Sequence, residues 1–184
     1  MKSRTTLVAL SLSVLASGVA LAAEPVLPLD RAEAVAVRSV PVTLAKAVAI
    51  AERQGHGKVM NIVSRPDRPD DRYVVTLVDN GRISWGTVDA VSGIFAPSHE
   101  STIAIRQTSH AERADVTALE NSALPLAKAV RTAESYTHGK AGDAGIETMR
   151  GGKLAYEVRV LKDGSFHDVW VDPASGKVLE AATA

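Results

Sequence analysis

The sequence predicts an α+β protein made of two tandem units, each with one helix packed on a three- to four-stranded antiparallel sheet. Three observations support this fold class. A helical block occurs twice, each copy is followed by strands of alternating apolar and polar residues, and an Asn-Gly or Asp-Gly turn interrupts each set of strands. A pattern repeated at a fixed spacing is typical of two copies of one structural unit.

The repeated block predicts one helix in each unit. Residues 44–58 (LAKAVAIAERQGHGK) align without gaps with residues 126–140 (LAKAVRTAESYTHGK), and 10 of 15 positions are identical. Both copies place apolar residues at i, i+3, i+4 and i+7, which makes an apolar stripe along one helix face. Thr43 suits an N-cap and Pro125 a first helical position. We expect Gly57 and Gly139 to end the helices, because glycine readily adopts the left-handed conformation of a C-terminal cap.

The second repeated block predicts strands. Residues 73–78 and 83–88 flank Asp79-Asn80-Gly81, and residues 154–161 and 165–171 flank Asp163-Gly164, as expected for two tight hairpins. One more strand is expected before each hairpin, at 59–63 and 145–149, and a short edge strand after it, at 94–95 and 177–179. Between the hairpin and the edge strand, Asp-x-x-Ser-Gly occurs at 89–93 and 172–176, where it indicates a structural turn.

The N-terminus indicates export. Lys2 and Arg4 precede an apolar run over 7–21, and Ala20-Leu21-Ala22 is typical of a signal-peptidase site. We therefore predict a signal peptide (1–22), an N-terminal segment (23–42), unit 1 (43–95), a partly ordered connecting segment (96–122) and unit 2 (123–184).

Composition narrows the location and the partners. The chain has no cysteine, so it has neither a disulfide framework nor a site for a lipid-linked cysteine. Without Lys2 and Arg4, acidic residues outnumber basic ones by two, which argues against a nucleic-acid binder. We expect a periplasmic or secreted protein that is soluble and has no stable membrane insertion after signal cleavage.

The motifs L-x-x-A-V-x-x-A-E, Y-x-V, the Asn-Gly or Asp-Gly turn and V-D-x-x-S-G-x-V together resemble the PepSY domain. The copy at 126–179 is the closer match; the copy at 43–95 departs from the pattern where Ala96-Pro97 replaces the usual apolar edge strand. PepSY domains occur in propeptides of thermolysin-like metallopeptidases and in many exported bacterial proteins. The resemblance implies binding or inhibition of a peptidase or other envelope protein, without catalytic residues. Because the chain has no H-E-x-x-H motif, such a peptidase would act in trans.

Strand parity suggests a binding face. Phe166 and Trp170 alternate with Val169 and Val171, and Trp85 points away from Val88, so aromatic side chains gather on the face that the valines do not occupy. Trp85, Phe166 and Trp170 are therefore the predicted partner-binding residues, for a protein or peptide. The alternative is that the other unit or the connecting segment covers this face.

A second hypothesis is a small-ligand or metal sensor or carrier that uses His56 and His138, which occupy equivalent positions before Gly-Lys. Histidine near a helix C-terminus is also favoured by the helix dipole, so this pattern has a purely structural interpretation. The sequence has no motif typical of a catalytic nucleophile, a phosphate-binding loop or a calcium-binding loop. The sequence thus predicts no cofactor and no enzymatic activity.

Overall fold

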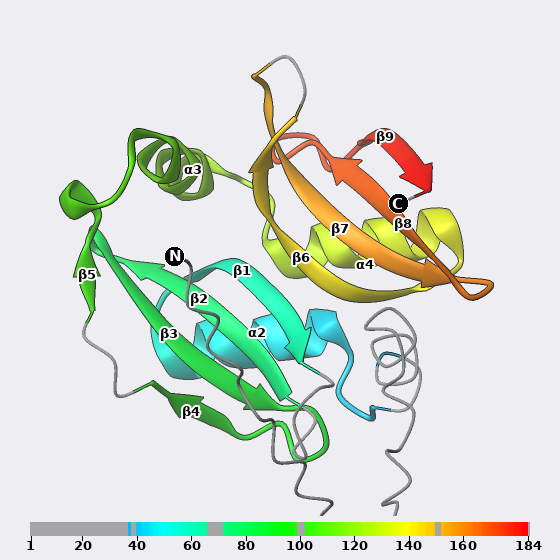
Figure 1. Ribbon diagram of the computed structural model, residues 1–184, viewed down its shortest axis with the longest axis horizontal. Helices are drawn as coiled ribbons and strands as arrows, with labels where there is room; N and C mark the ends of the chain where they lie inside the picture. Colours follow the sequence, from blue (N-terminus) through cyan, green and yellow to red (C-terminus); the bar gives the residue numbers. More distant parts are fainter. Residues whose placement is uncertain (1–36, 38–39, 66–71, 99–101, 150–151, 184) are drawn as a thin grey trace, which may run out of the picture.

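A computed structural model describes residues 37, 40–65, 72–98, 102–149 and 152–183. Its strands form one antiparallel sheet in the order β4-β3-β2-β1-β6-β7-β8-β9, and β5 pairs with β3 beside β4. The helices α2 and α4 pack side by side on one face of this sheet (Figure 1). The predicted α+β class is confirmed. The two predicted sheets, however, join edge to edge into one.

The N-terminal half contains α2 (Leu44–Gly55), β1 (Lys58–Arg65), β2 (Arg72–Asp79), β3 (Arg82–Asp89) and β4 (Phe95–Pro97). The side chain of Thr43 accepts a hydrogen bond from the backbone N–H of Lys46, so Thr43 is the N-cap, as predicted. The β2–β3 turn places both Asn80 and Gly81 at positive φ, the geometry that a two-residue hairpin requires.

The C-terminal half contains α4 (Leu126–Thr137), β6 (Lys140–Thr148), β7 (Leu154–Lys162), β8 (Ser165–Val171) and β9 (Val178–Thr183). Its hairpin turn also has two positive φ angles, at Asp163 and Gly164. β6 begins at residue 140, five residues before the predicted strand. Ala-Gly-Asp-Ala-Gly has low strand propensity, but pairing on both sides, with β1 and β7, fixes this segment in the sheet.

The described part of the connecting segment, residues 96–98 and 102–122, contains ordered elements, in agreement with the partial order that the sequence predicts. It forms β5 (Ile103–Ala104), the 3-10 helix η1 (Ile105–Gln107) and α3 (His110–Asn121). Ser109 and Glu112 make a complete capping box at the start of α3. α3 packs against β1 and β6, and Lys58 Nζ donates to the carbonyl oxygens of Leu119 and Glu120 at the C-terminal end of α3. This segment therefore braces both halves (Figure 1).

The junction between the halves is nearly symmetric. Asn61 pairs with Gly145, Ile62 with Ala144 and Val63 with Asp143. The repeat offset of 82 relates residue 61 to 143 and 63 to 145, so the pairing is self-complementary about Ile62 and Ala144. Both strands also carry a bulge at equivalent positions, Met60 and Gly142. The two halves thus meet as subunits meet across a twofold axis.

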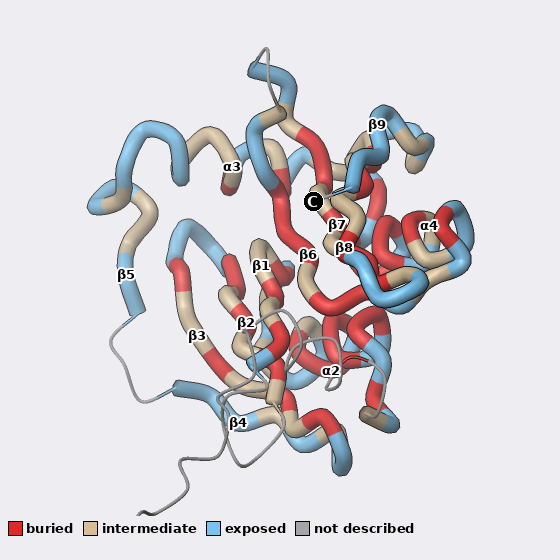
Figure 2. The backbone as a smooth tube through the Cα atoms, turned by 45° about the vertical axis from the view of Figure 1, so that its right-hand side comes forward, coloured by how far each residue is buried: buried red, intermediate tan, exposed pale blue. Residues whose placement is uncertain are grey.

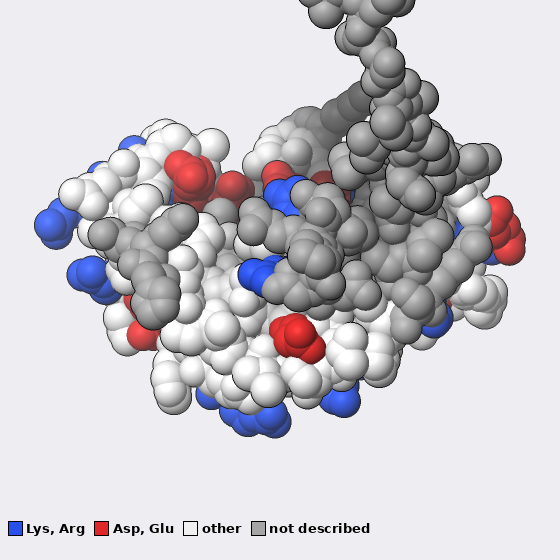
Figure 3. Space-filling model, turned by 60° about the horizontal axis from the view of Figure 1, so that its bottom comes forward, with Lys and Arg blue, Asp and Glu red and all other residues white. Residues whose placement is uncertain are grey.

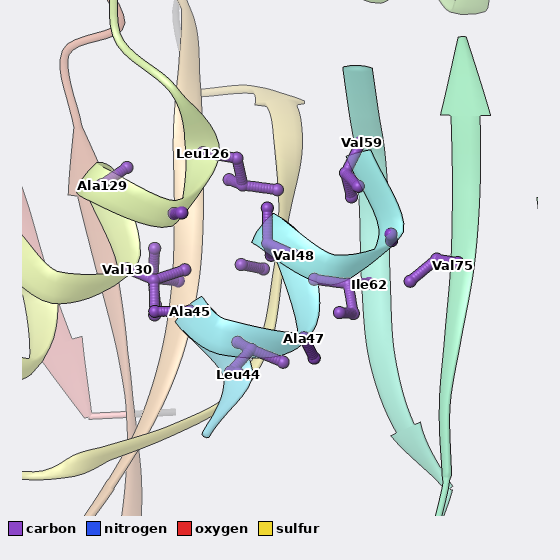
Figure 4. Packing of buried hydrophobic residues seen from close by; sticks show 14 of the residues in the cluster. Leu44, Ala45, Ala47, Val48, Val59, Ile62, Val75, Leu126, Ala129 and Val130 are labelled. Atoms are coloured by element: carbon purple, nitrogen blue, oxygen red, sulfur yellow. The ribbon is translucent and has the colours of Figure 1, made fainter. Parts of the chain in front are cut away.

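One main hydrophobic core spans both halves. α2 contributes Ala47, Val48 and Ala51, and α4 contributes the equivalent Ala129, Val130 and Ala133, all fully buried. Figure 4 shows Val48 and Leu126 next to each other where the two helices meet. Figure 2 shows buried residues along the two helices and the central strands, whereas β9 and the turns are largely exposed. None of the helices in the described ranges has the length and hydropathy needed to span a bilayer.

Candidate functional site

The candidate site lies on the sheet face opposite α2 and α4, which we call the outer face. Cross-strand pairing places the following residues in one row across this face: Trp85, Thr76, Asn61, Gly145, Glu157, Trp170 and Glu180. Trp85 and Trp170 are five strands apart, about 24 Å at ~4.8 Å per strand. The predicted parity of these tryptophans is confirmed.

Phe166 is on the outer face but is not available to a partner. Its side chain is 7% exposed and packs with Leu161 and Val37, and the guanidinium of Arg159 lies 4.5 Å from the centre of its ring. The prediction that Phe166 belongs to an open aromatic patch is therefore wrong. Its neighbours in the fold, which the sequence pattern does not reveal, bury the ring.

The two tryptophans are half-buried rather than open. Trp85 packs against the main core, and the neighbouring outer-face residues Ile83 and Val78 are buried within that core, together with Val116 of α3. The connecting segment thus covers part of the outer face of the N-terminal half, as the alternative interpretation of the sequence expected.

A hollow of about 390 Å³ opens on the outer face beside the junction of β1 and β6. It is lined by Asn61, Val63, Asp143, Ala144, Gly145, Glu147, Glu157, Arg159 and Asp168. Asp143 accepts a hydrogen bond from the backbone N–H of Ser64 at 2.8 Å and so also supports the junction. Among the described residues, Glu147, Glu157 and Asp168 accept no hydrogen bond, and the buried Nε of Arg159 finds no acceptor.

The electrostatics of this hollow are dominated by carboxylates. Burial raises the pKa of Glu157, and repulsion from Asp168 and Glu147 raises it further. Burial likewise raises the pKa of Glu147, helped by repulsion from Asp115 on α3. On the side of the molecule seen in Figure 3, by contrast, Lys and Arg are interspersed with Asp and Glu. The hollow is therefore a local concentration of negative charge.

The residues that are identical in the two halves have structural roles. Tyr73 Oη donates to the carbonyl of Val42, and Tyr156 Oη donates to that of Leu124. Glu52 and Glu134 each accept a hydrogen bond from the backbone N–H of the second residue of the following strand, Val59 in β1 and Ala141 in β6.

Asp89 and Asp172 likewise have equivalent roles, because each caps its own turn by accepting the backbone N–H of Ser92 or Ser175. The structural interpretation of these two turns is confirmed.

His56 and His138 are the C-caps of α2 and α4. Because β1 and β6 are antiparallel and each strand follows its own helix, the two helix C-termini lie at opposite ends of the junction. They cannot share one ion. Within the described residues, no three histidine or carboxylate side chains converge in a way that would hold a metal.

Residues 123–182, which span α4 and β6 to β9, match the family model described as peptidase propeptide and YPEB domain. This part of the chain is similar to PepSY domains. The matched range does not include the N-terminal half, whose resemblance to the family stays a prediction.

Among solved structures, a candidate lipoprotein from Clostridium difficile 630 is similar at 17% identity and a TM-score of 0.47, over 80% of this chain and 96% of that one. No curated protein matches the chain significantly.

The charged hollow is the feature that the sequence interpretation missed. Its residues alternate along β6, β7 and β8, so they could have been found by asking where the two repeats differ rather than where they agree. Aromatic residues make up only 4% of the chain, so two or three on one face are a more conspicuous sequence pattern than charges, which are common.

Proposed function

We propose that this chain is an exported binding protein, without enzymatic activity, that recognises a protein or peptide through the outer face of its joined sheet. The PepSY domain at 123–182 supports the proposal, because the family description names peptidase propeptides, which act by binding a peptidase. The observation that carries the proposal is the hollow of about 390 Å³, in which Glu147, Glu157 and Asp168 accept no hydrogen bond from a described residue.

Two features of the outer face favour a protein over a small ligand. The hollow is lined by Asn61, Gly145 and Glu157, which lie in the same cross-strand row as Trp170 and Trp85, and a row that crosses several strands is a surface suited to an extended chain. Half-buried tryptophans are also common anchors at protein interfaces. In this proposal the N-terminal half is a second PepSY-like unit that extends the sheet, and the partner is a peptidase or another envelope protein.

Position-specific crosslinking tests this proposal. A photoreactive benzoylphenylalanine at Thr76 or Asn61, both on the outer face, is compared with the same group at Lys128, which is exposed on α4. We expect adducts with an envelope protein from the two outer-face positions and none from Lys128. Equal adducts at all three positions, or none at any, would refute binding by this face.

If the partner is a peptidase, the chain should inhibit it, and this can be measured separately. Titrating the purified chain into a thermolysin-like metallopeptidase should slow cleavage of a peptide substrate, and the Trp170→Ser variant should inhibit less. If the peptidase is unaffected while crosslinking at Thr76 persists, the partner is an envelope protein of another class.

The proposed export also has a direct measurement. The mass of the chain recovered from the periplasmic fraction should correspond to a start at Ala23 or Glu24. Recovery of the intact chain in the membrane fraction would contradict cleavage.

A further inference from the structure

The two halves differ where the hollow lies. Several helix-facing residues are the same in both, namely the pairs Tyr73 and Tyr156, Val75 and Val158, and Val88 and Val171. The equivalent outer-face positions change as follows: Asn61 to Asp143, Val74 to Glu157, Thr76 to Arg159, Trp85 to Asp168 and Thr87 to Trp170. Since the N-terminal half builds the same strands from mostly uncharged residues, these strands do not need the charges of the C-terminal half.

We propose that the outer face of the C-terminal half binds an extended basic peptide segment, one Lys or Arg side chain of which enters the hollow. This inference rests on the proposed function and names its partner by chemistry. Among the described residues that line the hollow, Glu147, Glu157 and Asp168 accept no hydrogen bond and only Arg159 is basic, so the charge of these residues complements a cation. The one guanidinium, that of Arg159, is held over Phe166 at 4.5 Å and leaves Glu157 and Asp168 without a hydrogen bond from it.

The geometry around Glu157 suits a cationic side chain. Glu157 pairs directly across the strands with Trp170, so a bound ammonium or guanidinium would have a carboxylate on one side and an aromatic ring beside it. Burial raises the pKa of both Glu157 and Glu147, and repulsion from neighbouring carboxylates raises it further; a bound cation would offset this repulsion.

Other occupants fit less well. The hollow of about 390 Å³ is within the range of roughly 300–1,000 Å³ found for ligand pockets, and it is too large for one bare ion. In the described part of the chain no three carboxylates converge on a metal position. A nucleic acid would be repelled by the charge of the hollow.

Fluorescent nonapeptides of alternating Thr and Lys test the inference with the full chain, and fluorescence anisotropy measures the affinity. Two matched peptides carry N-acetyl-lysine or Glu in place of Lys. The test variant is Glu157→Gln with Asp168→Asn, and the control is Glu120→Gln with Asp163→Asn, which removes the same charge at exposed positions on α3 and in a turn.

We expect the Lys peptide to bind, the other two peptides not to bind, and added salt to weaken binding. The test variant should bind about tenfold more weakly, and the control should stay within about twofold of the wild type. Circular dichroism verifies that both variants fold.

The inference is overturned if acetylated and unmodified peptides bind equally, or if the test variant binds like the control. It also fails if sedimentation shows that the chain self-associates as its concentration rises and that the test variant weakens this self-association. The occupant of the hollow would then be a second copy of the chain. If no peptide binds, crosslinking at Thr76 distinguishes failure of this inference from failure of the proposed function. Adducts that persist would refute only the basic partner, whereas absence of adducts would refute the proposed function as well.

Discussion

His56 and His138, the C-caps of α2 and α4, have left-handed backbone conformations, with φ of 54° and 57°. The glycines that follow do not. A Cβ on Gly57 would lie 2.7 Å from the carbonyl oxygen of Val78, and one on Gly139 would lie 2.6 Å from that of Leu161. The glycines are needed for space beside the hairpin, and the histidines take the conformation that glycine normally supplies. The prediction that glycine is the left-handed cap was therefore wrong by one residue.

This geometry predicts opposite effects for adjacent substitutions. His138→Gly should raise the free energy of unfolding by about 1 kcal/mol, because left-handed backbone costs other residues more than glycine. Gly139→Ala should lower it by about 2 kcal/mol, because the backbone of β7 would have to move. Urea denaturation measures both. Stabilisation by Gly139→Ala would contradict the close contact with Leu161.

Asp172 makes stability depend on pH at the acid end. The Lys153 side chain, at 2.9 Å, and then the backbone N–H of Ser175 hold its pKa well below the usual range. A lowered pKa stabilises the fold above the unfolded pKa, and this contribution is lost as the pH falls through the folded pKa. Asp172→Asn should therefore lower the melting temperature at pH 7, and the difference from wild type should shrink below about pH 4. A difference independent of pH would mean that the carboxylate charge is irrelevant.

At the scale of elements, α3 is the helix whose contacts carry an electrostatic cost. Burial raises the pKa of Asp115, with repulsion from Glu112, and Asp115 in turn raises the pKa of Glu147 on β6. One oxygen of Asp115 is buried without a partner among the described residues. A raised carboxylate pKa favours the fold when the group is protonated, and this advantage is lost as the pH rises through the folded pKa.

Asp115→Asn should therefore stabilise the protein at pH 7, by up to about 1 kcal/mol because the side chain is only partly buried. The gain should vanish near pH 4, where the wild-type carboxylate is protonated in part. Glu120→Gln on the same helix is the control. Thermal unfolding at both pH values measures the difference, and an equal gain at both would show that packing rather than charge is responsible.

Short sequence motifs correctly predicted the turns and helix starts whose structure depends on only a few neighbouring residues. Asn80-Gly81 and Asp163-Gly164 specify hairpins, and Thr43 specifies a helix start, so these were predicted correctly. The segment 140–144 was missed because pairing with β1 and β7, which is distant in sequence, makes it a strand. The capping box of Ser109 and Glu112 was a readable signal that the sequence interpretation did not use for α3. The hollow was unpredictable from either half alone, since it needs β1 beside β6.

At the scale of the whole molecule, the shared core decides whether the halves unfold together. In the described residues, β1 and β6 form three cross-strand residue pairs, compared with eight between β2 and β3. The backbone junction alone would be weak. The helices compensate, because Val48 of α2 and Val130 of α4 are fully buried in a single core that includes residues of both halves. Packing rather than strand pairing should thus couple the halves.

The chain contains two tryptophans, Trp85 in one half and Trp170 in the other, so each half has its own fluorescent probe. Trp170→Phe leaves a probe on β3, and Trp85→Phe leaves one on β8. In both backgrounds urea should produce one transition with the same midpoint, because coincident transitions from different probes indicate two-state unfolding. The equivalent substitutions Val48→Ala and Val130→Ala should each cost about 2 kcal/mol.

Each valine substitution should also shift the urea midpoint reported by both tryptophans by the same amount, although each valine lies in only one half. If Val130→Ala shifts the transition of Trp170 and leaves that of Trp85 unchanged, the halves are independent domains joined by a short ladder, and the shared core does not couple them. Coupled unfolding would instead mean that a partner bound to the outer face of the C-terminal half also stabilises the N-terminal half, because ligand binding to a two-state protein stabilises all of it.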